Sequence, residues 1–217
     1  MNNDKNEKTL HDIGSAFGTD KARHMHCGQS YLHIYQNYFE PLRNMELNFL
    51  ELGVKGGHSL RTWKNYFQKS NIWGADHNPN CKSHEEERIN VLICEQHSEE
   101  ILETSKKVSG FDIILDDASH INSLSLASFN LLFPSLKKGG FYIIEDLANS
   151  YVDLSNPNIK WDGELQRNKS NGVNLNHDRQ ILNDLFLSLI EKMDKGDEDI
   201  HYVHFWSRII IIKKGDQ

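Results

Sequence analysis

The stretch from Phe111 to His120 constrains the fold of this chain more than any other part of the sequence. Four of its first five residues are apolar, two adjacent acids follow, and a histidine stands three positions after the second acid. A buried parallel strand that ends in a polar site has this pattern. The stretch from Gly140 to Asp146 repeats it. If the two strands are parallel neighbours, one edge of a sheet gathers four carboxylates and one imidazole, those of Asp116, Asp117, Glu145, Asp146 and His120.

Carboxylates gathered in this way repel one another unless a hard cation lies among them, so the cluster predicts a site for Mg²⁺ or a similar divalent ion. His120 would then stand beside the metal as a base. Either acidic pair alone has a simpler interpretation as a solvated loop or a helix N-cap, with Asp117 or Ser119 capping a helix that begins near Asn122. Two pairs on consecutive strand ends, one of them followed by a histidine, favour the metal site.

The stretch from Asn48 to Leu60 predicts a strand, a glycine turn and the start of a helix. The turn holds three glycines within five residues. Glycines there let the backbone approach a ligand closely, and the helix N-terminus offers free N–H groups. This arrangement is typical of a nucleotide site, although the spacing lacks the G-x-G-x-x-G of dinucleotide binders. The next strand ends at Asp76, 25 residues after Glu51, where doubly wound sheets place the acid that hydrogen-bonds ribose hydroxyls.

Strands and helices alternate along the chain, which predicts a right-handed α/β sheet with helices on both faces. One residue separates the last two strands, so they are expected to form an antiparallel hairpin. Lys137 to Gly140 is expected to close the preceding helix, and the aromatic helix over residues 31–39 is interpreted as packing, without a catalytic part. The strands are predicted over residues 48–52, 71–76, 89–94, 111–116, 140–146, 201–206 and 208–213, and the helices over residues 9–17, 31–39, 98–108, 122–136 and 177–193.

The composition excludes several classes of protein. The net charge of −7 and the pI near 5.9 argue against a protein that wraps nucleic acid, because such a protein needs a basic face. No apolar run approaches the roughly 20 residues of a membrane span, and the first five residues are too polar for a secretory signal. We therefore expect a cytoplasmic protein with no membrane partner. The three cysteines are too few and too scattered for a disulfide framework or a zinc site and are expected to be reduced.

The length of 217 residues, without a Pro- or Ser-rich linker, predicts one main domain. We expect a helical appendage over residues 1–45 and the main domain over residues 46–217. An irregular segment over about residues 148–176 leaves directly from the second acidic pair. A loop of this length inside a compact domain is usually functional, so we expect it to form a lid over the substrate.

Several blocks of the sequence together resemble a known family. In combination they are similar to the Rossmann-like class of S-adenosylmethionine-dependent methyltransferases, and within it to the metal-dependent sugar O-methyltransferases of macrolide and tetracenomycin biosynthesis (the mycinamicin, tylosin and elloramycin type). The resemblance covers roughly residues 14 to 151 and the terminal hairpin. The blocks are Gly18-Thr19-Asp20-Lys21, Phe49 to Val54, Gly57 to Leu60 with Trp63, Asp116 to His120, Leu132-Phe133-Pro134, Gly139-Gly140, and Ile144 to Leu147 with Ser150-Tyr151.

The resemblance implies a seven-stranded Rossmann-like sheet, S-adenosylmethionine and Mg²⁺ as cofactors, and methyl transfer to a sugar hydroxyl of a glycosylated natural product or surface polysaccharide precursor. Asp117, Glu145 and Asp146 match the Mg²⁺ ligands of the family, and His120 matches its general base. The implied partner is a small-molecule glycoside or sugar; assembly into a homo-oligomer stays open, and the identity of the sugar does not carry over. The cofactor-binding residues assigned in this way are Glu51, Gly53, Ser59, Asp76, Gln96, Asp116 and Lys21.

Other functions stay open at this point. A catechol-type O-methyltransferase would use the same metal chemistry on an aromatic diol, and the metal-binding oxygenases known as cephalosporin hydroxylases share parts of the pattern. A dinucleotide-dependent oxidoreductase is disfavoured by the glycine spacing. A non-catalytic partner that keeps the fold for assembly is disfavoured by the acidic cluster, because crowding of like charges is costly and has no use in a scaffold.

Overall fold

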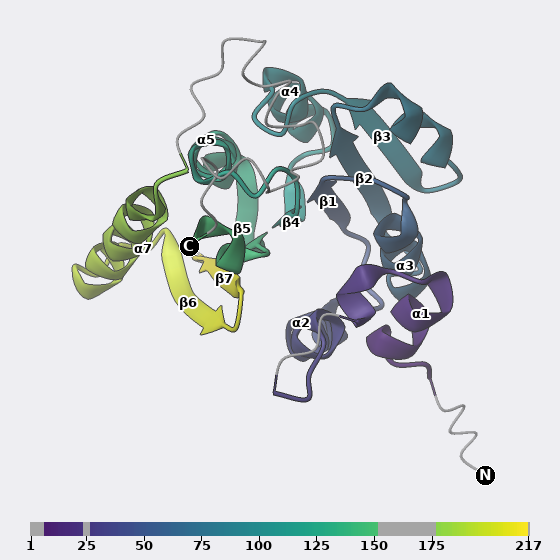
Figure 1. Ribbon diagram of the computed structural model, residues 1–217, viewed down its shortest axis with the longest axis horizontal. Helices are drawn as coiled ribbons and strands as arrows, with labels where there is room; N and C mark the ends of the chain where they lie inside the picture. The colour runs from purple at the N-terminus through teal and green to yellow at the C-terminus, as the bar shows by residue number, and fades with distance from the viewer. Residues whose placement is uncertain (1–6, 24–26, 152–176, 217) are drawn as a thin grey trace.

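A seven-stranded mixed sheet forms the centre of the molecule in the computed structural model, which describes residues 7–23, 27–151 and 177–216 (Figure 1). The strand order is β3-β2-β1-β4-β5-β7-β6. The predicted α/β fold class and each of the predicted strands are confirmed. The strands are β1 (Asn48–Leu52), β2 (Asn71–Asp76), β3 (Ile89–Ile93), β4 (Phe111–Asp116), β5 (Leu136–Ile144), β6 (Ile200–Trp206) and β7 (Ile209–Lys214).

Strands β1 to β5 are parallel, and β7 pairs antiparallel with both β5 and β6. The predicted hairpin is therefore confirmed, but its second strand does not lie at the edge of the sheet. The reason is the run of four isoleucines from Ile209 to Ile212, all of them fully buried. A strand that is apolar on both faces needs neighbours and helices on every side, whereas β6 carries exposed polar and aromatic side chains and forms the edge.

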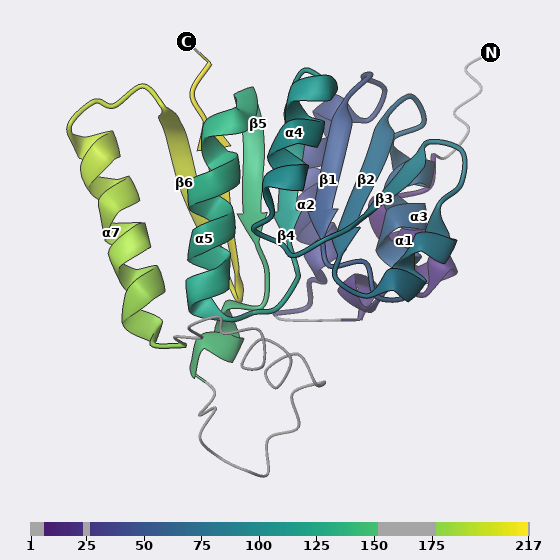
Figure 2. The same ribbon diagram turned by 90° about the horizontal axis from the view of Figure 1, so that it is seen from above.

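Helices cover both faces of the sheet, as Figure 2 shows. Alternate strand residues point to opposite faces: Ile113 and Leu115 pack with the first helix layer, while Ile114 and Tyr142 pack with the second. The first layer contains α1 (Leu10–Phe17), α2 (Tyr31–Phe39) and α3 (His58–Tyr66), and the second contains α4 (Glu99–Lys107), α5 (Asn122–Leu132) and α7 (Arg179–Asp194).

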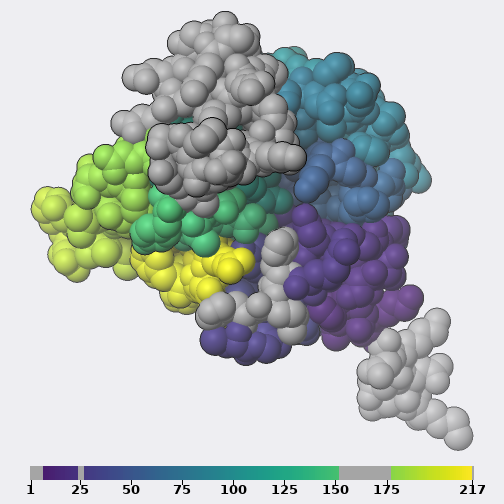
Figure 3. Space-filling model, viewed as in Figure 1, coloured from purple at the N-terminus to yellow at the C-terminus, as the bar shows by residue number. Residues whose placement is uncertain are grey.

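The two N-terminal helices share a hydrophobic core with the sheet. Thr9 begins α1 with a capping box, and Gly18 ends it in a left-handed conformation, which glycine adopts at no steric cost. Helix α2 places Phe39 against Phe49 of β1, and Tyr35 stacks on Phe39. In the space-filling view the purple N-terminal segment lies directly on the blue segment that follows it (Figure 3). The boundary predicted at residue 45 stays a prediction.

The C-terminal end of one predicted helix, that before β5, is wrong. The helix predicted over residues 122–136 stops at Leu132, a short 3₁₀ helix follows, and β5 starts at Leu136, so Lys137 to Gly140 belongs to the strand and does not close the helix. Pro134 explains the early stop, because proline has no N–H to donate to the carbonyl four residues earlier.

The predicted lid lies largely outside the described residues: the structure describes residues 148–151 of it, which belong to a short 3₁₀ helix, Leu147–Tyr151. Among the described residues no helix combines the length and the apolar character that crossing a bilayer requires.

Candidate active site

Backbone hydrogen bonds align the carboxyl ends of the three central strands. Gly53 N donates to Ala75 O over 2.8 Å, Asp117 N to Leu52 O over 3.0 Å, and Glu145 N to Asp116 O over 3.0 Å. These bonds continue the parallel ladder by one residue beyond each strand. The glycine turn after β1 and the acidic residues after β4 and β5 therefore lie side by side at one edge of the sheet. This edge is also where the strand order reverses between β1 and β4, which is the place where doubly wound sheets bind ligands.

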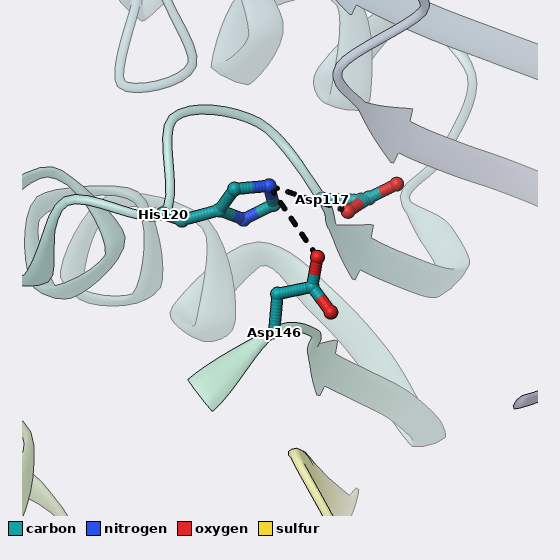
Figure 4. A group of neighbouring side chains, drawn as sticks. All are labelled: Asp117, His120 and Asp146. Atoms are coloured by element: carbon teal, nitrogen blue, oxygen red, sulfur yellow. Dashed lines mark ion pairs between the residues drawn. The ribbon is translucent and has the colours of Figure 1, made fainter. Parts of the chain in front are cut away.

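Asp117, His120 and Asp146 meet at this edge, and each offers one ligand atom within 4.8 Å of the other two. His120 Nε2 lies 3.8 Å from Asp117 Oδ1 and 3.7 Å from Asp146 Oδ2 (Figure 4). Two atoms bound to one Mg²⁺ at about 2.1 Å lie at most about 4.2 Å apart, and both distances fall inside that limit. The three side chains are 21–23% exposed. Asp117 and Asp146 therefore offer a hard divalent ion carboxylate oxygens that solvent and a substrate can reach, with the His120 imidazole beside them.

Two residues of this group have strained backbone. His120 has φ of 56° and Asp146 has φ of 54°, a left-handed conformation that non-glycine residues adopt rarely, though His and Asp do so more often than most. Such strain costs on the order of 1–3 kcal/mol per residue and collects at functional sites. Both residues lie in the turns that follow β4 and β5, and their side chains face each other (Figure 4).

Lys21, which the family resemblance assigns to the cofactor, lies at the centre of the acidic residues; its part in cofactor binding stays a prediction. It is 1% exposed, and its ammonium contacts Asp117 Oδ2, lies 2.8 Å from Glu145 Oε2 and 3.3 Å from Glu51 Oε1. The left-handed end of α1 and the short 3₁₀ helix Asp20–Ala22 carry the lysine over the strand ends. One side chain thus connects the end of β1 with the ends of β4 and β5.

Two tyrosines complete the group, and sequence reasoning missed both. Tyr31 Oη donates to Asp146 Oδ1 over 2.6 Å, and Tyr35 Oη donates to Glu145 Oε1 over 2.6 Å. Both come from α2, the helix that was interpreted as packing only. Their spacing of four residues, which puts both rings on one face of the helix, was the available signal. That face binds the carboxylates of Glu145 and Asp146 and orients them.

The charges in this group favour a further cation. Burial alone would lower the pKa of Lys21, but the carboxylates of Asp117, Glu145 and Glu51 outweigh it and hold that pKa well above its usual range. Burial and the neighbouring Asp117 raise the pKa of Glu145 well above its usual range, against the opposing effect of Lys21 and Tyr35. One ammonium faces three carboxylates, so a second positive charge would relieve the repulsion that remains.

Glu51 is fully buried beneath the glycine turn. Its Oε2 accepts hydrogen bonds from Ser59 Oγ over 2.6 Å and from Trp63 Nε1 over 3.1 Å. Its Oε1 has only the Lys21 ammonium, 3.3 Å away and too poorly aligned for a regular hydrogen bond among the described residues. Burial raises the pKa of Glu51 to about 7, despite the opposing effects of Lys21, Ser59 and Trp63. Glu51 and Ser59, both assigned to the cofactor by the family resemblance, thus contact each other, and their part in cofactor binding stays a prediction.

Glu51→Gln should raise the free energy of unfolding at pH 8 by about 3 kcal/mol. Folding raises the pKa of Glu51 from 4.5 to about 7, and each pKa unit corresponds to about 1.4 kcal/mol of stability lost when the buried carboxyl group is ionised. The folded chain binds the proton of the Glu51 carboxyl group more tightly than the unfolded chain does. The stabilisation that this proton gives the unmodified chain is therefore complete below pH 4.5 and is lost as the pH rises through 7. Glutamine keeps an acceptor for Ser59 and Trp63 without the buried charge.

Urea unfolding without cofactor, followed by circular dichroism between pH 5 and pH 8, measures this effect. Glu86→Gln, which removes a carboxylate from a surface pair with Lys64, is the control. A stability difference between Glu51→Gln and the unmodified chain that does not grow with pH would contradict the prediction.

Asp76, a further predicted cofactor residue, lies at the same edge of the sheet at the end of β2. Asp76 accepts hydrogen bonds from the backbone N–H groups of Val54, Lys55 and Asn78 over 2.8–3.1 Å. Burial would raise its pKa, but these donors outweigh burial and lower it, so the carboxylate is ionised. Since a carboxylate offers about four acceptor positions, Asp76 keeps the capacity to accept from a ribose hydroxyl.

Asp116 and Asp117 point to opposite sides of the sheet. Asp116 is 2% exposed, and the amide of Gln96 lies 3.4 Å from each of its carboxylate oxygens. The four carboxylates expected at one point therefore divide: Asp116 lies beside Gln96, Asp117 and Glu145 lie beside Lys21, and Asp146 lies beside Tyr31 and His120. Gly53 has φ of 92°, and a Cβ there would collide with the carbonyl oxygen of Asp117, so only glycine lets the two strand ends approach so closely.

Comparison with known proteins gives relatives for most of this chain, although no family model matches it. It is 37% identical to the demethylmacrocin O-methyltransferase of Streptomyces fradiae and 36% identical to the mycinamicin VI 2''-O-methyltransferase of Micromonospora griseorubida, each over 151 residues that cover 65% of this chain and 37% of the relative. It is 34% identical over 130 residues to the 8-demethyl-8-alpha-L-rhamnosyl tetracenomycin-C 2'-O-methyltransferase of Streptomyces olivaceus, covering 56% of this chain and 34% of that protein. The match spans little more than a third of each relative.

Solved structures agree with the sequence relatives. The MycE methyltransferase of the mycinamycin biosynthetic pathway, in complex with Mg and SAH, superimposes with a TM-score of 0.73 at 28% identity over 96% of this chain and 55% of that one. The same values hold for its complex with Mg, SAH and mycinamycin VI. The Rossmann-like methyltransferase fold and the resemblance to macrolide and tetracenomycin sugar O-methyltransferases are thereby confirmed.

Proposed function

From this homology we propose that the chain is the catalytic part of an S-adenosylmethionine-dependent, Mg²⁺-dependent O-methyltransferase that acts on a sugar hydroxyl of a glycosylated small molecule. The observation that carries the proposal is the meeting of Asp117, His120 and Asp146 within 4.8 Å, next to the glycine turn after β1. A cofactor pocket and a metal site at one sheet edge are what methyl transfer to a metal-bound hydroxyl requires. The relatives supply the class of acceptor.

Asp117 and Asp146 would hold the metal, with Glu145 as the third predicted ligand. Both oxygens of Glu145 have partners of their own, Tyr35 and Lys21, so its assignment rests on the family resemblance. When bound, Mg²⁺ supplies a lowered pKa for a hydroxyl that it coordinates, and S-adenosylmethionine supplies the methyl group. Glu51, Ser59 and Asp76 are the residues proposed to hold the cofactor, since all three line the turn after β1 and the end of β2.

His120 would take the proton from the sugar hydroxyl at Nε2. This nitrogen lies between Asp117 Oδ1 and Asp146 Oδ2, and two carboxylates at that distance stabilise the imidazolium that forms. Tyr31 holds Asp146 through its other oxygen, and Lys21 holds Asp117 through its other oxygen. The base thus stays in one position relative to both aspartates, and proton transfer needs such fixed geometry.

An assay of methyl transfer tests the proposal. The purified chain is incubated with S-adenosylmethionine, Mg²⁺ and a panel of glycosides with adjacent sugar hydroxyls, plus one catechol, and the products are analysed by mass spectrometry. We expect a glycoside to gain one methyl group, the reaction to stop in excess EDTA, and activity to return when Mg²⁺ is added back.

Two results would change the proposal. Methylation that continues undiminished in excess EDTA would remove the metal from the mechanism. Methylation of the catechol alone would assign the aromatic diol as substrate class, because the same metal chemistry serves both acceptors. Binding of NAD without binding of S-adenosylmethionine, measured by calorimetry, would exclude methyl transfer altogether.

A further inference from the structure

Lys21 has an environment that is unusual for a lysine. Its side chain is 2% exposed, and three carboxylates surround its ammonium, those of Glu51, Asp117 and Glu145. Lysine is almost never fully buried unless it is paired, and here it has more partners than charge balance requires. Lys21 lies between α1 and α2, and its ammonium contacts acids at the ends of β1, β4 and β5. Its charge therefore acts where the proposed metal and cofactor sites adjoin.

The ammonium and a divalent ion would use the same carboxylates. Lys21 contacts Asp117 Oδ2 while the other oxygen, Oδ1, faces His120. It also takes Glu145 Oε2, and Tyr35 takes Glu145 Oε1. An ion that binds Asp117 must therefore share that carboxylate with Lys21, and an ion that binds Glu145 must share an oxygen with Lys21 or with Tyr35.

Two positive charges on one carboxylate weaken each other's binding, because each repels the other and withdraws charge from the shared group. The effect is large at this place, since a buried ammonium is screened much less than a surface one. Asp146 differs from Asp117 and Glu145, because it contacts Tyr31 and His120. The competition thus concerns Asp117 and Glu145 and leaves Asp146 as the ligand from which binding can begin.

Resting on the metal site of the proposed function, we propose that Lys21 is an internal counter-cation that competes with the divalent ion for Asp117 and Glu145. Lys21 keeps these carboxylates together when the ion leaves and weakens the ion's affinity when it binds. If Lys21 had only a structural role, its loss would have the opposite effect: the metal ligands would lose their order and metal binding would weaken.

Lys21→Met tests the two alternatives. Methionine has similar length and no charge, so we expect the variant to bind Mn²⁺ at least about tenfold more tightly at pH 8, because the competing charge is gone. Lys21→Arg keeps the charge and should bind Mn²⁺ within a few fold of the unmodified chain. The matched control is Lys137→Met, which removes an ammonium that pairs with Asp112 over 2.8 Å at the opposite edge of the sheet and should leave Mn²⁺ binding unchanged.

Mn²⁺ titration of EDTA-treated, dialysed protein, followed by electron paramagnetic resonance of the free ion, gives the affinities without any turnover. Equal or weaker binding by a folded Lys21→Met would overturn the inference. If this variant is unfolded in EDTA, refolding on addition of Mn²⁺ supports the inference, and failure to refold while Lys21→Arg folds overturns it. No Mn²⁺ binding by the unmodified chain would instead refute the metal site of the proposed function.

Discussion

His120→Gln should lower kcat for methyl transfer by about 10²–10⁴-fold, the range that a general base contributes, while binding of S-adenosylmethionine stays within a few fold of that of the unmodified chain. Glutamine occupies similar space but cannot accept and hold a proton. The imidazole Nε2 lies between two aspartate oxygens at 3.7 and 3.8 Å and not against the cofactor residues, so the loss should fall on the chemical step and not on cofactor binding.

Steady-state kinetics with the glycoside identified in the methyl-transfer assay, combined with calorimetric titration of S-adenosylmethionine, separates the two effects. The matched control is His201→Gln: His201 also faces an aspartate, Asp216, over 3.6 Å, but it lies near the start of β6, at the opposite edge of the sheet. A His120→Gln variant with a kcat equal to that of His201→Gln would show that another group removes the proton.

Asp117→Asn should weaken Mg²⁺ binding by at least about 100-fold, since even residues that only orient metal ligands cost about 10–100-fold when replaced. Asparagine keeps one oxygen but loses the charge, and a neutral amide is a poorer ligand for a hard divalent ion than a carboxylate. The same change removes one of the three negative partners of Lys21. We therefore expect methyl transfer that needs far higher Mg²⁺ concentrations for half-maximal rate.

The control for this variant is Asp112→Asn. Asp112 lies near the start of β4 and pairs with Lys137 over 2.8 Å. Asp112→Asn is therefore the same change of residue type and also removes a charged partner from a lysine, but at the end of β4 away from the site. Thermal unfolding of both variants shows whether they fold. If Asp117→Asn and Asp112→Asn required the same Mg²⁺ concentration as the unmodified chain, Asp117 would not be a metal ligand.

The strands were predictable from the sequence because their signal is local. Each central strand contains a short apolar run that polar residues follow, so the run and its polar end can be read within about six residues. The first residue of β5, four positions before the predicted one, could not be read in this way. The order of the last two strands was not predictable, since a hairpin has the same sequence pattern whether its second strand lies at the edge or inside. Burial of Ile209 to Ile212 on both faces decided it.

The acids and the histidine of the site were predictable for a similar reason: Asp117, His120 and Asp146 each lie within four residues of a strand end, and parallel strands gather their ends at one edge. The partners of these acids were not. Lys21 reaches Asp117 across 96 residues of sequence, and Tyr31 reaches Asp146 across 115. Nothing in the local pattern of a lysine after a glycine turn, or of a tyrosine in an aromatic helix, indicates which distant carboxylate it will contact.

The sequence by itself determined that this chain forms a parallel α/β sheet with acidic residues at the ends of β4 and β5, because periodicity and strand-end chemistry are properties of neighbouring residues. Only the tertiary structure decided that Asp116 turns away to Gln96 while Asp117 turns to Lys21, and that α2 brings its tyrosines to Glu145 and Asp146. These contacts depend on how the N-terminal helices pack over the strand ends, and the free energy of that packing comes from apolar side chains spread over the whole core.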